Sequence, residues 1–439
     1  MAVLAPMALA AAPCVAALCG AEFLAGVPLT AAQIPATRPV HIVAIGDSHT
    51  AGDAITGALR ELLQARLGNG GRGLMPAGRP HAGVRTRGVT VTTSGPWSAR
   101  GLFGSGAAEA WPPRGITGYT LSSNRPGAAL SLTADASFTA FGVCVAAASD
   151  GPRLALTLGT DTQELDLTGD GPQCRRIAPA VAVDSARLEL VAGEAIVTGW
   201  WLERPQGVIV SNLGVPGSQL QFLGRADEAT MAAQFAALPA DLVILAFGTN
   251  EGFAPFFDAL RLEGQIREQV ARIRRIAGPV PILMIGPPDA ASRNRELMDN
   301  VVGGTPGAAV DCNPAIQATP DRLPVEGFDI PIWSDAGGTL APDPVTLSGP
   351  MPRPVRRGLP LFNPPALAAA SAVQRRVAAD LGVAFWDWRA RQGGSCSAVR
   401  WMQAGLMGPD FIHYSPAGGA EVARLLLADL DAAREAAPH

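Results

Sequence analysis

The sequence predicts an α/β fold with a parallel sheet, into which an all-β sandwich module is inserted. Short apolar runs, such as 40–46 and 241–247, alternate with helical patterns, which is typical of parallel sheets with right-handed crossovers. Between 85 and 204 the pattern changes to short alternating segments separated by Gly/Asp turns, which is typical of a β-sandwich. We therefore expect a discontinuous α/β domain over 38–84 and 205–435, interrupted by the sandwich module at 85–204.

Length and charge set the broad class of the protein. A chain of 439 residues can hold two domains. The formal net charge of -4 gives no electrostatic footprint for nucleic acid, so we expect no nucleic-acid partner. All 34 basic residues are arginine, which, together with heavy use of Ala, Gly and Pro, we interpret as coding bias and not as function.

The first 27 residues are small and apolar, and Glu22 is their only charged residue. This run resembles the apolar core of a secretory signal with a cleavage site near 30–32, although it lacks a basic start. An uncleaved N-terminal anchor and a mis-set start are the alternatives. We predict that 1–32 is a signal peptide or anchor, that the protein is periplasmic or secreted, and that only this segment can associate with a membrane. Cys14 and Cys19 are interpreted as part of it.

The segment around Ser48 organises the rest of the chain. An apolar run over 40–45 predicts a buried parallel strand that ends at Gly46-Asp47-Ser48, and a helical pattern follows from Ile55 to Leu67. Open α/β folds build their sites at the edge of the sheet where the carboxyl ends of the strands lie. A serine here lies beside N–H groups at a helix N-terminus, which can stabilise an oxyanion. The alternative is that Asp47 and Ser48 only cap the helix.

A nucleophilic serine needs a base, and His413 is the best placed of the five histidines. His413 lies in a loop just before a final amphipathic helix, and Asp410 precedes it by three residues. This spacing allows the carboxylate to bind one ring nitrogen while the other faces the nucleophile, as in a serine triad. Asp387, at the end of a predicted strand, is the less suitable acid. A surface Asp/His pair is the alternative interpretation.

Two further strand ends carry polar or glycine residues. The strand over 241–247 is followed by Gly248-Thr249-Asn250-Glu251, in which Asn250 offers a side-chain N–H donor. The strand beginning at Val208 ends near Gly214, whose backbone N–H no side chain obstructs. Asparagine at a strand end is often only a turn residue. Together with the Ser48 and His413 segments, however, these strand ends indicate one site at one edge of the sheet.

The order of these segments resembles the SGNH (GDSL-type) hydrolase superfamily. The resemblance implies the three-layer fold of that superfamily, with Ser48 as nucleophile, His413 as general base and Asp410 as its orienting acid. It also implies an oxyanion hole formed by the Ser48 N–H, the Gly214 N–H and the Asn250 side chain, with Asp47 and Thr249 in supporting positions. No cofactor and no metal are implied.

Within the superfamily the chain most resembles bacterial peptidoglycan O-acetylesterases. The similar segments include 46–50, 70–73, 211–215, 247–251, 286–289, 384–388 and 401–418. The resemblance implies a serine esterase that removes O-acetyl groups from a cell-wall glycan, with O-acetylated peptidoglycan as the favoured substrate. An esterase for another polysaccharide, a glycan O-acetyltransferase with the same triad, and a non-catalytic cell-wall binding protein are the alternatives.

The remaining features concern the insert and the cysteines. The esterases that the chain resembles carry a carbohydrate-binding-like insert at this place. Trp97, Trp111 and Tyr119 are therefore candidates for stacking on sugars, with a place in the core as the alternative, whereas Trp200 and Trp201 are expected in the core. The four other cysteines predict disulfides Cys144–Cys174 and Cys312–Cys396, with reduced buried cysteines as the alternative. No spacing suggests a zinc site.

Overall fold

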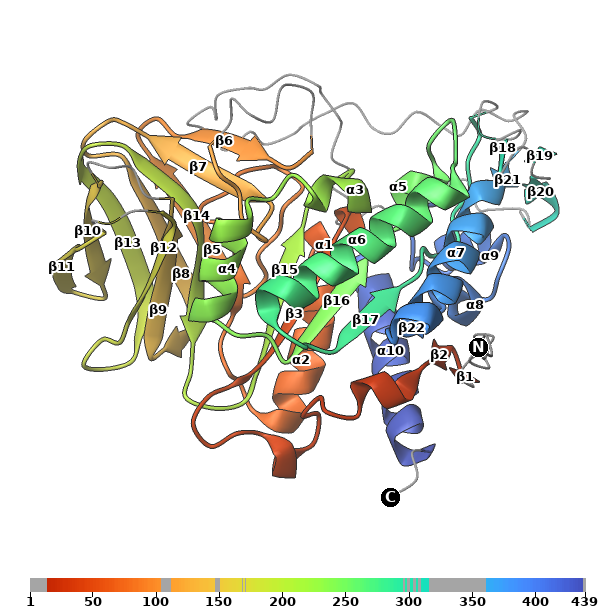
Figure 1. Ribbon diagram of the computed structural model, residues 1–439, viewed down its shortest axis with the longest axis horizontal. Coiled ribbons are helices and arrows are strands. Elements are labelled where there is room, and N and C mark those ends of the chain that lie inside the picture. Colours follow the sequence, from red (N-terminus) through yellow and green to blue (C-terminus); the bar gives the residue numbers. More distant parts are fainter. Residues whose placement is uncertain are drawn as a thin grey trace, which may run out of the picture.

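The computed structural model describes residues 14–103, 112–146, 151–167, 169, 171–294, 297, 301–302, 305–306, 309–315 and 361–436. Its centre is a mostly parallel sheet with helices on both faces (Figure 1), so the predicted α/β class is confirmed. In spatial order the strands of this sheet are β1 (Cys14–Val15), β2 (Leu18–Cys19), β22 (Ala384–Trp386), β17 (Ile282–Ile285), β16 (Leu242–Ala246), β3 (Val40–Gly46) and β15 (Val208–Gly214).

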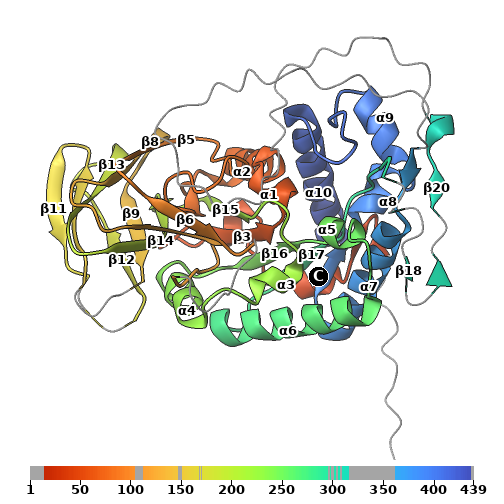
Figure 2. The same ribbon diagram turned by 90° about the horizontal axis from the view of Figure 1, so that it is seen from above.

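Side chains alternate between the two faces of the central strand β3. Ile42 and Ala44 pack against α2 (Ala54–Leu67) and α10 (Pro416–Ala436). Val43 and Ile45 pack in a second cluster with residues of α4 (Glu228–Ala237), α6 (Ala259–Ala277) and α7 (Pro365–Leu381). Figure 2 shows the resulting three layers, with α2 and α10 on one side of the sheet and α6 and α7 on the other.

Short helices follow the carboxyl ends of the parallel strands, as expected where the site is built. They are α1 (Ser48–Ala51) after β3, α3 (Leu220–Leu223) after β15, α5 (Thr249–Gly252) after β16, and α8 (Trp388–Gln392) after β22. Helix α9 (Ser397–Gln403) comes next in the chain and precedes the loop that carries His413. Between β17 and α7 the described residues form only short elements. They include the strands β18 (Val301–Val302), β19 (Thr305–Pro306), β20 (Val310–Asp311) and β21 (Phe362–Asn363) and the 3-10 helix η5 (Asn313–Ala315).

The insert forms two antiparallel sheets, as the alternating pattern predicts. One contains β11 (Asp161–Leu165), β10 (Arg153–Leu158), β13 (Val183–Ala192), β8 (Ala129–Phe138) and β5 (Val89–Ser94). The other contains β12 (Gln173–Ile177), β9 (Ala140–Val145), β14 (Ala195–Glu203), β7 (Tyr119–Ser123) and β6 (Ser98–Gly101). A strand from before the insert, β4 (Gly73–Met75), also pairs with β14 and so joins the sandwich to the α/β domain.

The aromatic residues of the insert are mainly core residues. Trp200 and Trp201 are fully buried, as expected, and they belong to two different core clusters. Trp97 and Tyr119 are also buried, at 3% and 5% exposure. These two rings are not available for stacking on a sugar, so their alternative role in the core holds. Trp111 lies outside the described residues.

The N-terminal segment corrects one expectation. Cys14 and Cys19 form a disulfide across the β1–β2 hairpin, and β2 pairs with β22 at the edge of the central sheet. The 3-10 helices η1 (Ala21–Leu24) and η2 (Ala31–Gln33) follow. Leu18, Val27 and Leu29 are buried in the core cluster that contains α2 and α10. The two cysteines, which were interpreted as part of a signal or anchor, are therefore packed against the central sheet in this structure.

The predicted disulfides Cys144–Cys174 and Cys312–Cys396 are both present. The first joins the neighbouring strands β9 and β12 of the sandwich. The second joins the segment before η5 to the N-cap of α9, within a small core that includes Met407 and Phe411. This disulfide therefore stabilises the small core on which the loop that carries His413 packs. Within the described ranges no helix is both long and apolar enough to cross a membrane.

Candidate active site

Ser48 lies at the tight turn between β3 and α1. Asp47 caps the helix, and its carboxylate accepts the His49 N–H at 2.9 Å. The turn requires glycine at position 46, because a Cβ there would lie 2.7 Å from the carbonyl oxygen of Ala246. The strand therefore delivers Ser48 to the carboxyl edge of the sheet at a fixed position. Capping by Asp47, which was the alternative interpretation of this turn, is therefore compatible with the placement of Ser48 at the edge of the sheet.

His413 and Asp410 complete a hydrogen-bonded relay with Ser48. His413 Nε2 lies 2.9 Å from Ser48 Oγ, and His413 Nδ1 lies 2.7 Å from Asp410 Oδ2. Both distances are those of ordinary hydrogen bonds. The three residues come from segments 365 positions apart in the sequence, so only the fold brings them together. The geometry is that of a nucleophile, a base and an orienting acid.

The loop holds the Asp410 carboxylate with its own backbone. Asp410 Oδ1 accepts the N–H groups of Ile412 at 3.0 Å and His413 at 3.1 Å. Phe411, which lies between Asp410 and Ile412, takes a left-handed backbone conformation with φ at 58°, which is rare for a bulky residue. Burial by itself raises the pKa of Asp410, but the hydrogen bond and charge of His413 outweigh it, so the pKa is lowered and the carboxylate stays ionised.

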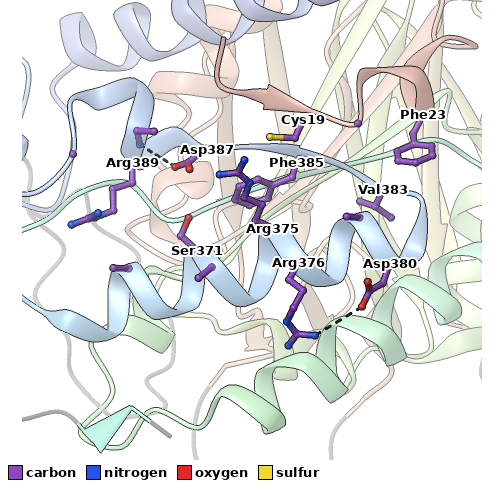
Figure 3. Close-up of a pocket in the computed structure, with 16 residues that line it drawn as sticks. Cys19, Phe23, Ser371, Arg375, Arg376, Asp380, Val383, Phe385, Asp387 and Arg389 are labelled. Carbon is purple, nitrogen blue, oxygen red and sulfur yellow. Dashed lines mark hydrogen bonds and ion pairs between the residues drawn. The ribbon is translucent and has the colours of Figure 1, made fainter. Parts of the chain in front are cut away.

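Asp387 does not take part in this relay. Its carboxylate accepts the Ala390 N–H at 3.0 Å and so caps α8. Figure 3 shows Asp387 on the wall of a different cavity of about 690 Å³, between α7 and the N-terminal segment. Arg375 and Phe385 also line that cavity, but Ser48, Asp410 and His413 do not. The spacing argument for Asp410 over Asp387 therefore agrees with the geometry.

The expected oxyanion donors are placed unequally. Asn250 is close to the turn that carries Ser48, because its Nδ2 lies 3.4 Å from Asp47 Oδ2. It also donates to the Ser218 carbonyl at 3.0 Å. The Gly214 N–H, in contrast, already donates to Asn212 Oδ1 at 3.1 Å. Gly214 ends β15, where it pairs with Gly46. The single Gly214 N–H is thus committed within the domain, whereas Asn250 Nδ2 carries two hydrogens and its contact with Asp47 is long and weak.

Gly217 is a better candidate that the sequence analysis missed. It precedes Ser218, the residue whose carbonyl binds Asn250, and its φ of 72° favours glycine. Among the described residues, neither the Gly217 N–H nor the Ser48 N–H has a hydrogen-bond acceptor. The signal in the sequence was the second glycine of the segment Gly214-Val215-Pro216-Gly217. Thr249, expected in a supporting position, is buried and begins α5.

Comparison with known proteins identifies the family. The profile of the GDSL-like lipase/acylhydrolase family matches residues 192–420, which is more than half of the chain. The chain belongs to this family. The matched range contains Asn250, Asp410 and His413, and it begins after Ser48, which lies before the sandwich module in the chain. No curated protein matches the chain.

Solved structures show the same fold. The chain is similar to a peptidoglycan O-acetylesterase, with 23% identity and a TM-score of 0.64 over 95% of both chains. It also matches a family two carbohydrate esterase from Clostridium thermocellum, at 11% identity and a TM-score of 0.27 over 77% of this chain and 98% of the other. The corresponding enzyme from Cellvibrio japonicus matches at 12% and 0.17, over 45% and 79%. The first match confirms the expected SGNH hydrolase fold, and the last two are too distant to add to it.

Glu251 is a second residue of this GDSL-like hydrolase that the sequence analysis did not single out. Its buried carboxylate accepts the Leu220 N–H at 2.7 Å and the Gly248 N–H at 3.0 Å. It therefore ties the helix that carries Asn250 to the segment that contains Gly217 and Ser218. Burial is the main cause that raises the pKa of Glu251 to about 7, and the neighbouring Asp47 adds to it.

This raised pKa predicts a pH-dependent stability. For a carboxyl group whose pKa is higher in the folded state, the stabilisation is full below the ordinary pKa and is lost as pH rises through about 7. The advantage of wild type over Glu251→Gln in free energy of unfolding should therefore shrink by on the order of 3 kcal/mol between pH 5 and pH 8. Urea unfolding at both pH values measures it. An equal difference at the two values would contradict the assignment.

Within the described part of the chain, no group of three His, Cys, Asp or Glu side chains is arranged to hold a metal ion.

Proposed function

We propose that this GDSL-like hydrolase is a serine esterase that removes O-acetyl groups from a cell-wall glycan, with peptidoglycan as the favoured substrate. The observation that carries the proposal is the continuous hydrogen bonding from Ser48 Oγ through the His413 ring to the Asp410 carboxylate. The likeness in fold to a peptidoglycan O-acetylesterase over 95% of both chains supports the choice of substrate.

The first half of the reaction acylates Ser48. His413 Nε2 accepts the hydroxyl proton while Ser48 Oγ attacks the acetyl carbonyl, and Asp410 stabilises the imidazolium that forms. The carbonyl oxygen becomes negatively charged in the tetrahedral intermediate. We assign its stabilisation to the Ser48 N–H, the Asn250 side chain and the Gly217 N–H, which replaces Gly214 in this role. The intermediate collapses to an acetyl-serine and a sugar hydroxyl, which receives its proton from His413.

The second half hydrolyses the acetyl-serine. Water takes the place of the sugar, His413 accepts its proton, and the new oxyanion occupies the same donors. Collapse of this intermediate releases acetate and returns the proton to Ser48. If a second glycan hydroxyl attacks in place of water, the same residues perform acetyl transfer. The exclusion of water distinguishes these two outcomes.

We also propose that the protein acts outside the cytoplasm, in the periplasm or as a secreted protein. Three disulfides support this, because disulfides persist in oxidising compartments and are rare in the cytosol. A cell-wall glycan as substrate is consistent with the same location.

Acetate release tests the proposed function. Purified O-acetylated peptidoglycan and acetylated xylan would each be incubated with wild type and with Ser48→Ala, and acetate would be quantified. We expect release by wild type, fastest from peptidoglycan, and none by Ser48→Ala. Faster release from xylan would overturn the substrate, and acetyl recovered on an added glycan acceptor would favour transfer. No release from any acetyl ester would contradict the esterase.

Asn250→Ala should lower kcat by about 10²–10³-fold, because the variant loses a hydrogen bond to the oxyanion that forms only in the transition state. KM should change little. Asn69→Ala is the matched control, since Asn69 lies beside the opposite end of β15, where it pairs with Val208. Steady-state kinetics on a soluble acetyl ester measure both variants. An Asn250→Ala enzyme with kcat near that of wild type would exclude Asn250 as a donor.

A further inference from the structure

The buried imidazole of His49 lies between the nucleophile turn and the loop of the base. Its ring nitrogen Nδ1 is 3.1 Å from Asp47 Oδ1, and Nε2 is 2.9 Å from the backbone carbonyl oxygen of Ile412. Ile412 directly precedes His413 in the sequence. His49 is only 7% exposed. Although His49 directly follows Ser48 in the chain, it takes no part in the proposed proton transfers.

The two partners determine how many protons the ring carries. A backbone carbonyl oxygen accepts hydrogen bonds and cannot donate them, so Nε2 must carry a proton. An ionised carboxylate likewise only accepts, so Nδ1 must carry one as well. A neutral imidazole has one N–H, and only an imidazolium has two. Because imidazole ordinarily binds a proton more tightly than a carboxylate, by about two pKa units, the shared proton belongs on the ring.

The surroundings of His49 are consistent with a fixed cation. Burial by itself lowers its pKa, but the charge and hydrogen bond of Asp47 and the bond to Ile412 outweigh it, so the pKa is raised. The other titratable groups that face the ring are Asp410, His413 and Tyr414. The ring centroids of His413 and Tyr414 lie 5.6 Å and 5.8 Å from that of His49. Trp388 packs edge-on at 5.4 Å. Little water reaches this place, which strengthens charge-assisted hydrogen bonds.

We propose that His49 is an imidazolium that positions the catalytic loop, by clamping the Ile412 carbonyl to the Asp47 carboxylate of the nucleophile turn. The proposal rests on the proposed function of the site. The clamp joins the two segments that must stay in register for His413 to reach Ser48 Oγ. His49 is a positioning residue, since it contacts neither the reacting atoms nor the oxyanion donors other than through Asp47 and Ile412.

The clamp has a defined pH dependence. A histidine whose pKa is raised by folding stabilises the protein fully below its ordinary pKa, and this stabilisation is lost as pH rises through the raised value. Above that value the ring keeps one proton and one acceptor loses its donor. The loop then loses its attachment to Asp47, so kcat should fall on the alkaline side while KM changes little.

Nuclear magnetic resonance of the wild-type protein with ¹⁵N-labelled histidine tests the protonation directly. We expect both ring nitrogens of His49, assigned by the loss of their signals in His49→Gln, to be protonated at neutral pH. One unprotonated ring nitrogen at that pH would overturn the proposal. This measurement needs no substrate, so a failure of the proposed esterase activity would be seen separately, as wild type that releases no acetate.

The kinetic test couples this protonation to catalysis. Asp47→Asn removes the counter-charge, so the pH at which His49 loses its second proton should fall, and the alkaline limb of kcat should fall by the same amount. His49→Gln, which keeps only one donating group, should lower kcat by about 10²-fold at neutral pH through misplacement of the base. Arg153→Gln, on the exposed surface of the sandwich, is the control. An alkaline limb that stays in place in Asp47→Asn would contradict the positioning role.

Discussion

Ser48→Ala should lower kcat by about 10⁴–10⁶-fold on any acetyl ester that wild type hydrolyses. Alanine removes the oxygen that attacks the carbonyl, and no other hydroxyl in the described residues lies within hydrogen-bond distance of His413 Nε2. Steady-state kinetics with a soluble acetyl ester measure the effect. The residual rate reflects the oxyanion donors and binding alone, which still exceed the reaction in water.

The control for Ser48→Ala is a measurement of its unfolding temperature, which shows whether the variant is folded. Ser48 is partly exposed and makes one side-chain hydrogen bond, to His413, so its replacement should leave the unfolding temperature nearly unchanged. A folded Ser48→Ala enzyme that keeps more than about a hundredth of wild-type kcat would exclude Ser48 as the nucleophile, because loss of a nucleophile costs far more.

His413→Gln should have an effect of similar size, about 10⁴–10⁶-fold in kcat, because the base and the nucleophile act as one unit. Asp410→Asn should cost about 10⁴-fold, since an amide favours the wrong tautomer of His413. The effects should not add: the double variant Ser48→Ala with His413→Gln should be no slower than Ser48→Ala within a few-fold. Additive losses would contradict a shared mechanism.

Asp410→Asn also has a stability signature. The pKa of Asp410 is lowered in the folded state, so its ionised form stabilises the protein above the ordinary pKa, and this stabilisation is lost as pH falls through the lowered value. The advantage of wild type over Asp410→Asn in urea unfolding should therefore be larger at pH 7 than at acidic pH. Asp387→Asn is the matched control, because Asp387 caps α8 and does not bind His413.

The sequence allowed Ser48, Asp410 and His413 to be singled out because the signals around them are local. The apolar run of β3 ending in Gly46-Asp47-Ser48 predicts both the strand and the turn. The spacing of three residues between Asp410 and His413 lets one loop supply both groups. Helix α7 is likewise bounded by local signals, because Pro365 stands in its first turn and Gly382 ends it.

Other features depend on strand pairings and on side-chain orientations, which a sequence pattern does not contain. Gly214 and Gly217 both follow an apolar run, but which N–H is free depends on the side chain of Asn212. The N-terminal hairpin has small apolar residues, and its pairing with β22, a strand far away in the sequence, is not contained in that local pattern. His49 adjoins Ser48 in the chain, yet its ring turns away from the nucleophile toward Ile412.

Trapping of the acyl-enzyme tests the central claim most directly. Wild type mixed with O-acetylated peptidoglycan would be quenched in acid within the first turnovers, digested after arginine residues and analysed by mass spectrometry. We expect one acetyl group on Ser48 in the peptide that contains it, and none after the same treatment of His413→Gln. An acetyl group at a different residue, or acetate release with no acetylated Ser48 at any quench time, would contradict the account.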